Sequence, residues 1–168
     1  MDQTKEWRAW TSLVPEYEYK PELPFSQILV PTKDTEKTTW VLKMMDKVKR
    51  PVVLIGETGT SKTATIQKYV NTLPRDVNIV LNMSFSSRTS SMDIQRYIEN
   101  NTEKRTKDVY GPTPGKRLVI FIDDMNMPQV DTYGTQQPIA LLKLLIEKGG
   151  FYDRGKELNW MFIKDICK

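Results

Sequence analysis

The chain has 168 residues, of which 39% are hydrophobic and 27% are charged, and its formal net charge is +4. These values are typical of one soluble globular domain with a hydrophobic core, with room for an additional arm. The single Cys167 and the lack of histidine exclude an internal disulfide, a cysteine-cluster metal site and His-based catalysis. Basic and acidic residues are interspersed, which favours a solvated surface over a nucleic-acid groove.

We also expect no membrane partner. The charged N-terminus does not resemble a secretory signal, and no apolar run approaches the roughly 20 residues of a membrane span. A reducing, cytoplasmic compartment fits the use of one cysteine.

Residues 1–29 form an arm rich in proline and aromatic residues, without a clear period. Its aromatic side chains either cover an edge of this domain or pack on a neighbour, and the sequence leaves both open; they are Trp7, Trp10, Tyr17 and Tyr19. A helix is predicted next, capped by Asp34 and ended before Pro51. Its apolar face contains Trp40, Val41, Met44, Met45 and Val48.

The most informative motif follows a short apolar run, Pro51–Ile55, which is typical of a buried parallel strand. The motif matches the phosphate-binding loop consensus G-x-x-x-x-G-K-[ST] except at Ser61, where the consensus has glycine. It consists of Gly56, Glu57, Thr58, Gly59, Thr60, Ser61, Lys62 and Thr63. Inward-pointing N–H groups and the start of a helix form an anion site, where Lys62 binds the β- and γ-phosphates and Thr63 ligates Mg²⁺.

Further elements are predicted in alternation beyond this loop. Val77–Met83 is a core strand, and Ser90–Asp93 is a capping box that opens a helix with Ile94, Tyr97 and Ile98 inward. Tyr110–Gly115 is a loop. A helix begins at Pro138, with Ile139, Leu142, Leu145 and Ile146 inward, and ends at Gly149 and Gly150. Lys156–Trp160 is predicted as a turn or hairpin, and Phe162–Ile166 begins another element that we expect to be unfinished.

A second motif lies between these elements. The apolar strand Leu118–Ile122 ends in Asp123 and Asp124, as in a Walker B motif, whose first acid holds Mg²⁺. Strands that alternate with helices indicate a parallel, right-handed α/β sheet with nucleotide at the carboxyl ends of its strands.

Asp124 stands where hydrolysing ATPases of this layout usually have glutamate, which orients the attacking water. Aspartate is shorter by roughly 1.5 Å, and a misplacement of about that size costs on the order of 100-fold in rate. A shifted water would still allow Asp124 to act as the catalytic base. We therefore expect nucleotide binding with slow or uncertain turnover.

Several segments together resemble the third AAA+ module of an axonemal dynein heavy chain. They are Val30–Thr35, Gly56–Thr63, Asn82–Thr89, Glu103–Arg105, Tyr110–Pro112, Phe121–Pro128, Gln136–Pro138 and Gly150–Asp153. Ser61 and Asp124, which depart from the usual motifs, are also typical of that module. The resemblance implies that residues 30–168 are an incomplete AAA+ large subdomain, an α/β P-loop NTPase sheet flanked by helices. We expect the chain to end before the sensor-1 strand and the helical lid.

The resemblance also implies a regulatory nucleotide site in a microtubule motor of the cilium axoneme, part of the cytoskeleton. ATP or ADP with Mg²⁺ would be the ligand, held by Lys62, Thr63 and Asp123, while Asp124 contacts water. Partners would be neighbouring AAA+ modules and other dynein chains, with microtubules reached only through the full-length motor. Two other hypotheses stay open: a freestanding P-loop ATPase acting on nucleic acid, and a non-catalytic truncated scaffold.

Overall fold

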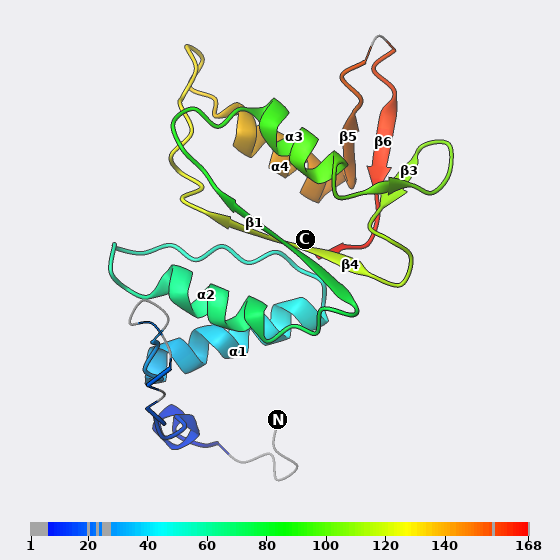
Figure 1. Cartoon of the computed structure of the whole chain (residues 1–168). Coiled ribbons are helices and arrows are strands. Elements are labelled where there is room, and N and C mark those ends of the chain that lie inside the picture. Colours follow the sequence, from blue (N-terminus) through cyan, green and yellow to red (C-terminus); the bar gives the residue numbers. More distant parts are fainter. Residues whose placement is uncertain (1–6, 20, 23, 25–27, 156, 168) are drawn as a thin grey trace. The chain divides into compact units, whose positions relative to one another are not determined.

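The computed structural model describes residues 7–19, 21–22, 24, 28–155 and 157–167 (Figure 1). These residues fall into two compact units, one over residues 1–73 and one over residues 74–168, and each is described by itself. Parts of the predicted arm, the predicted turn residue Lys156 and the last residue lie outside the described residues. The predicted division into an arm over residues 1–29 and a subdomain over 30–168 stays a prediction.

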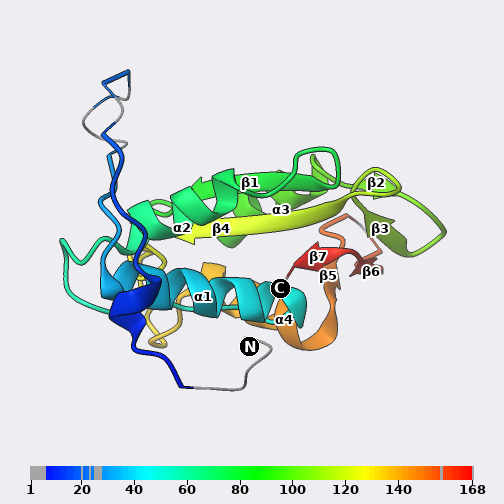
Figure 2. The same ribbon diagram turned by 90° about the horizontal axis from the view of Figure 1, so that it is seen from below.

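The first unit contains a short 3-10 helix, η1 (Trp10–Leu13), and two α-helices, α1 (Lys33–Lys47) and α2 (Lys62–Asn71). η1 lies against α1 (Figure 2), and the Trp10 ring meets the Trp40 ring edge-on, with 5.8 Å between their centroids. Trp10 therefore covers its own unit. Trp7 and Tyr19 are exposed, and Tyr17 is 40% exposed.

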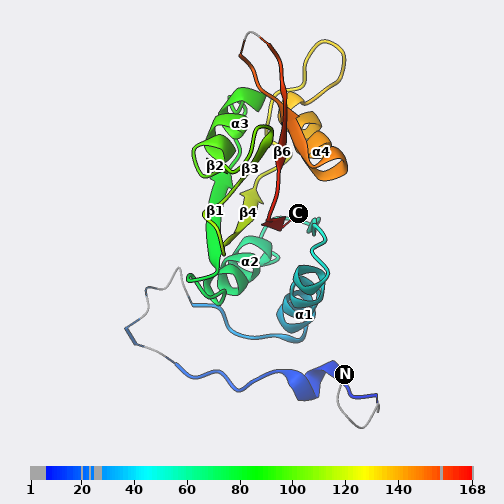
Figure 3. The ribbon, with the colours of Figure 1, turned by 90° about the vertical axis from the view of Figure 1, so that its right-hand side faces the viewer.

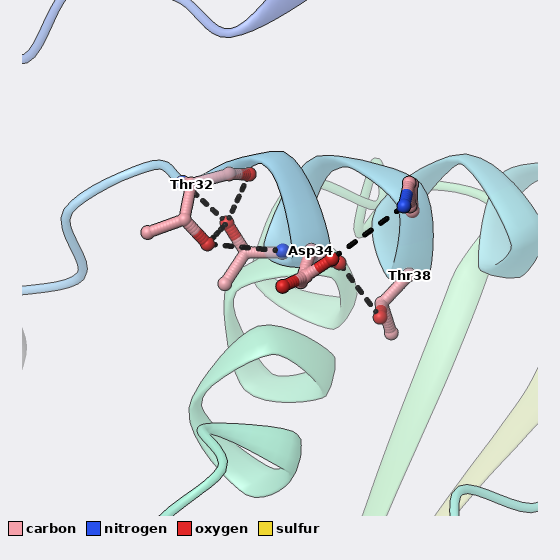
Figure 4. A network of polar contacts seen from close by, with 5 residues as sticks. Thr32, Asp34 and Thr38 are labelled. Atoms are coloured by element: carbon pink, nitrogen blue, oxygen red, sulfur yellow. Dashed lines mark hydrogen bonds and ion pairs between the residues drawn. The ribbon is translucent and has the colours of Figure 1, made fainter. Parts of the chain in front are cut away.

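The start of α1 is stabilised by a hydroxyl capping box (Figure 4). The Thr35 amide donates to Thr32 Oγ1 at 3.2 Å, and the Thr32 amide donates to Thr35 Oγ1 at 2.8 Å. Asp34 lies inside the first turn, so the prediction that Asp34 caps this helix is wrong. Its carboxylate lies 3.6 Å from Lys37 Nζ and near the positive end of the helix dipole, where an anion is favourable.

The predicted apolar face of α1 is only partly covered. Leu42 is the buried residue of α1, whereas four predicted face residues are exposed by more than a third; they are Trp40, Val41, Met45 and Val48. α2 runs beside α1 (Figure 3), and η1 and α2 are the elements packed on α1 in this unit. The exposed fractions of the four side chains show that part of this apolar face stays in contact with solvent. Tyr69 of α2 donates from its hydroxyl to Asp46 Oδ2 of α1 at 3.0 Å.

Pro51–Ile55 forms no strand in the described structure, so that prediction is wrong here. A strand requires a neighbour for its backbone hydrogen bonds, and the described part of the first unit is helical outside its loops. Val53 and Ile55 are 59% and 92% exposed.

The second unit contains a parallel sheet in the order β1-β4-β7, formed by β1 (Asn78–Ser84), β4 (Arg117–Asp123) and β7 (Ile166–Cys167). Ser84 pairs with Asp123, so β1 and β4 end at the same edge. Helices α3 (Ser91–Glu99) and α4 (Gln137–Lys148) connect these strands. Both connections cross the sheet in the same direction, and α3 and α4 lie side by side on one face of it (Figure 1). The predicted α/β fold with a parallel sheet flanked by helices is confirmed.

The predicted capping box of α3 is confirmed. The Asp93 amide donates to Ser90 Oγ at 3.2 Å, and the Ser90 amide donates to Asp93 Oδ2 at 2.9 Å. Ile94 and Ile98 are buried as predicted, but Tyr97 is 40% exposed, so its inward placement is wrong. Tyr97 lies at the rim of the buried stripe, where sequence spacing does not separate core from surface.

Helix α4 has Pro138 in its first turn and ends at Gly149, whose φ of 76° is the left-handed conformation that glycine tolerates at a helix end. Leu142 and Leu145 are buried, as predicted, and Ile139 is half-buried. Ile146 is 42% exposed, so its predicted inward position is wrong.

A mixed sheet completes the second unit, with β2 (Glu103–Lys104), β3 (Val109–Gly111), β6 (Trp160–Ile163) and β5 (Gly150–Tyr152) in that order. β5 and β6 are antiparallel, which confirms the hairpin alternative in the described residues, but Trp160 lies in β6 rather than in the turn. β3 pairs in parallel with β6, so the predicted loop over Tyr110–Gly115 is wrong at its first two residues. A three-residue strand held by a distant partner carries too short a pattern to be recognised.

The hydrophobic core gathers side chains from both sheets and both helices of the second unit. It consists of Leu81, Phe85, Ile94, Ile98, Leu118, Leu142, Leu145, Phe151, Met161, Ile163 and Ile166. Among the described residues, no helix has both the length and the apolar character needed to cross a membrane.

Candidate functional site

The phosphate loop, Gly56–Thr63, contains two residues with left-handed backbone. Gly59 has a φ of +84° and Ser61 has a φ of +59° with ψ of 22°, so two residues of the loop are left-handed. Alternation of right- and left-handed residues turns successive N–H groups toward one side and creates an anion-binding nest. Ser61 thus takes the conformation for which the consensus uses glycine, at a cost of about 1–2 kcal/mol.

Lys62 folds back over the loop that precedes it. Its Nζ donates to the carbonyl oxygen of Gly56 at 2.9 Å and to Thr60 Oγ1 at 3.0 Å, and a further bond reaches the Glu57 carbonyl. Thr60 Oγ1 in turn donates to the Glu57 carbonyl at 2.9 Å. The ammonium group therefore lies inside the phosphate loop, among oxygen atoms that a phosphate can replace as its partners.

The start of α2 supplies the remaining features of an anion site. The carbonyl of Ser61 accepts from the amide and the hydroxyl of Thr65, at 2.9 and 2.7 Å, which begins the helix at the loop. The first turn reads Lys-Thr-Ala-Thr, so lysine and neutral residues flank the positive end of the helix dipole. Thr63 is the second residue of α2, and Thr58 lies in the preceding turn.

The two predicted acids lie at the carboxyl edge of β4 in the second unit. Asp123 is the last residue of β4, and its carbonyl accepts from the Phe85 amide at 3.0 Å. Asp123 Oδ1 accepts from the Asp124 amide at 3.1 Å. The predicted site residues are thus divided between the units. The phosphate-loop residues lie together in the first unit, and the two acids lie together in the second.

Asp124 has an unusual backbone conformation. Its φ is +53°, in the left-handed region that aspartate and asparagine enter several times more often than other non-glycine residues. Glutamate has no such preference, which supplies a physical reason for the shorter acid at this position. The prediction from sequence considered only that aspartate is shorter than the usual glutamate, and it did not include this backbone conformation.

The β4–α4 loop, residues 124–136, is held by two polar side chains. Gln136 Nε2 donates to the carbonyl oxygens of Asn126 at 3.0 Å and Pro128 at 2.6 Å. Asp131 Oδ1 accepts from the amides of Tyr133 at 2.9 Å and Thr135 at 2.8 Å. Sequence reasoning assigned no role to Gln136; an amide side chain directly before a proline-started helix was the available signal.

Oxygen ligands suit the cation that the motifs predict. Threonine hydroxyl and aspartate carboxylate are ligands that Mg²⁺ accepts, usually together with phosphate oxygens and water. In the part of the chain that the structure describes, no group of three or more His, Cys, Asp or Glu side chains forms a separate metal cluster. Thr63 and Asp123, each within its own unit, carry oxygen donors of the kind that Mg²⁺ accepts.

Comparisons with known proteins agree with this chemistry. The family model described as the P-loop containing dynein motor region matches residues 17–168. The chain belongs to this dynein motor-region family. Its P-loop implies nucleotide binding with Mg²⁺ in general.

Individual dynein chains match at high identity. The chain is 61% identical over 165 residues to dynein axonemal heavy chain 10 of Homo sapiens. It is 57% identical over 160 residues to the dynein-1-alpha heavy chain, flagellar inner arm I1 complex, of Chlamydomonas reinhardtii. It is 40% identical over 154 residues to dynein axonemal heavy chain 2 of Homo sapiens.

These matches cover 98%, 95% and 89% of this chain, and the chain spans 4% of the length of each of these dynein relatives. The resemblance to axonemal dynein heavy chains is confirmed. The number of the AAA+ module stays a prediction. The hypothesis of a freestanding ATPase acting on nucleic acid finds no support in the matches.

Proposed function

We propose that this chain is an ATP- or ADP-binding AAA+ module of an axonemal dynein motor. The observation that carries the proposal is the phosphate loop, in which two left-handed residues lead into α2 with Lys62 among the loop oxygens. Lys62 and the loop amides hold the β- and γ-phosphates, and Thr63 and Asp123 ligate Mg²⁺. Bound Mg²⁺ supplies neutralisation of phosphate charge.

Asp124 is the residue that we propose to orient the attacking water. Its carboxylate follows the Mg²⁺ ligand directly, but its side chain is one methylene shorter than the usual glutamate. Slow turnover follows, because a misplacement of roughly 1.5 Å costs on the order of 100-fold. An arginine from a neighbouring module contributes about 10³-fold or more in related sites, so the isolated chain is expected to hydrolyse little.

At the level of the motor, we propose a regulatory nucleotide site in the third AAA+ module. The identity to axonemal heavy chains over nearly the whole chain supports placement in the cilium or flagellum axoneme. Partners are then neighbouring AAA+ modules and other dynein chains, and microtubules are reached through the full-length motor. Neither nucleic acid nor membrane is a partner in this proposal.

A nucleotide titration tests the binding claim. A fluorescent ATP analogue with Mg²⁺ is titrated into the wild-type chain, Lys62→Ala and Lys68→Ala, and anisotropy is measured. Lys68 is the matched control, because it lies exposed in the last turn of α2. We expect Lys62→Ala to weaken binding at least about tenfold, as loss of a charge-assisted bond does, with Lys68→Ala close to wild type. Equal affinities for all three chains would end the proposal.

A further inference from the structure

Gln136 is placed to act on Asp124 through the backbone between them. The Met127 amide donates to the Asp124 carbonyl at 2.9 Å, which closes a turn directly after the acid. The carbonyls on either side of Met127, those of Asn126 and Pro128, both accept from Gln136 Nε2. The turn from Asp124 to Met127 and the two carbonyls that flank Met127 therefore connect Asp124 to the side chain of Gln136.

Gln136 is itself fixed by the helix that it opens. It is the N-cap residue of α4, and its carbonyl accepts from the amides of Ile139 at 3.0 Å and Ala140 at 3.1 Å. Its side chain is half-buried. The backbone of Gln136 thus belongs to a helix whose Leu142 and Leu145 reach the core, while its side chain holds the start of the loop.

The chemistry of this contact requires an amide. Two carbonyl oxygens need two N–H donors from one side chain, and the glutamine amide nitrogen carries two. Glutamate has the same shape but offers only acceptors when ionised, so it would face both carbonyls with negative charge. Methionine has a similar length and no N–H donor, so it removes the bonds without adding charge.

The left-handed backbone of Asp124 is a conformation that these hydrogen bonds can stabilise. A non-glycine residue in that region is strained and is retained only where the surroundings hold it. Without the restraint, Asp124 would relax to a commoner conformation and its carboxylate would point elsewhere.

We infer that Gln136 is a positioning residue for Asp124: by holding the Asn126 and Pro128 carbonyls, it keeps the acid in its left-handed conformation. The inference rests on the proposed function, in which Asp124 orients water. It predicts an effect on turnover and little effect on nucleotide affinity, since Gln136 acts on the acid rather than on the phosphate loop.

The experiment compares Gln136→Glu, Gln136→Met and the control Gln137→Glu in the full chain, each with and without Asp124→Asn. Gln137 is the next residue and is exposed, so its variant adds the same charge beside the same helix end. Mg·ATP affinity is measured by titration, hydrolysis by single turnover with protein in excess, and exchange of the Met127 amide by NMR.

Both Gln136 variants are expected to lower the single-turnover rate at least about tenfold with affinity within about twofold of wild type. With Asp124→Asn present, they should lower the rate no further, a lack of additivity that general loss of stability would not produce. The Met127 amide should exchange at least about tenfold faster, while β4 amides and the Gln137→Glu chain stay as wild type.

Rate losses that add to those of Asp124→Asn, or that come with equal losses of affinity, would overturn the inference. Should the wild type bind no nucleotide, the proposed function fails. In that case, and also if the wild type binds nucleotide without measurable hydrolysis, the Met127 amide alone decides the inference. Unchanged exchange at Met127 in both Gln136 variants would then overturn it, and faster exchange confined to residues 124–128 would support the restraint.

Discussion

The two units of this chain are stabilised in different ways. The second unit buries a core of aliphatic and aromatic side chains drawn from β1, α3, β4, α4 and the mixed sheet. In the described part of the first unit, the buried residues are few, namely Leu42, Thr65, Tyr69 and Val70, and much of its order comes from local bonds such as the Thr32–Thr35 box. The phosphate loop belongs to the locally ordered unit, whereas the acids lie at the edge of the unit with the core.

The phosphate loop and the two acids therefore depend on different kinds of interaction. A phosphate loop needs backbone N–H groups and a lysine within a few residues of one another, so local conformation can build it. The acids must instead be held at the end of a strand, and that strand is fixed by side chains far away in the sequence. Variants should therefore affect the two units by different mechanisms and by different amounts.

The largest effect is expected in the core of the second unit. Phe151 of β5 has no exposed surface, and Phe151→Ala should destabilise this unit by about 4 kcal/mol through lost burial and the cavity left behind. Phe162→Ala on β6 is the matched control, because its ring is 45% exposed and should cost much less. Urea unfolding measures the free energy of unfolding of both variants, and amide protection of β4 is a second readout. Similar losses of stability in the two variants would show that the buried core does not stabilise this unit more than its surface does.

A smaller effect is expected from the backbone of the phosphate loop. Gly59→Ala places a Cβ that meets nothing within 4 Å, so its cost is the left-handed backbone alone, about 1 kcal/mol. Ser61→Gly should stabilise the first unit by a similar or smaller amount, since glycine takes the same conformation without strain. Amide exchange in α2 reports both changes, and the same sign for the two variants would contradict local backbone control of this unit.

The smallest expected effect is the pH dependence of the capping box at the start of α3. Hydrogen bonds from the Ser90 hydroxyl and amide hold the pKa of the Asp93 carboxyl below its ordinary value of 3.8. Because this pKa is lowered by folding, the cap contributes fully above pH 3.8 and its contribution is lost as pH falls through the folded pKa. The α1 cap uses two threonine hydroxyls and has no such titration.

We therefore expect protection of α3 amides to decline as pH falls below about 4. In Asp93→Asn that part of the decline should vanish, because asparagine does not titrate. Amide exchange from pH 3 to pH 6 measures it. An identical pH profile in the variant would show that the Ser90–Asp93 bonds do not set it.

The parts of this account that were predictable from sequence are those with local or strongly periodic signals. The capping box at Ser90, strand β4 with its terminal acids and helix α4 from Pro138 were all predicted and are present. The axonemal dynein family was predicted from segments spread over most of the chain. Residue types alone were sufficient to predict these features, because each element has its own recognisable sequence pattern.

The failures depend on partners distant in the sequence or on backbone angles. Pro51–Ile55 has strand-like residues, but a strand forms only beside another strand. Tyr97 and Ile146 lie within helical spacing of buried residues and are nevertheless exposed. Aspartate favours the left-handed region only moderately, and a glutamine before a helix does not reveal which carbonyls it binds. The restraint on the acid was therefore not predicted from these weak signals.

The proposed function depends most on its Mg²⁺ site, for which we propose that Thr63 and Asp123 ligate the same ion together with the nucleotide. The most direct measurement is the Mg²⁺-dependent gain in nucleotide affinity for wild type, Thr63→Val, Asp123→Asn and the double variant. If both residues ligate the same ion, each single variant should lose most of that gain and the double variant little more. Independent, additive losses, or an undiminished gain in Asp123→Asn, would contradict the account.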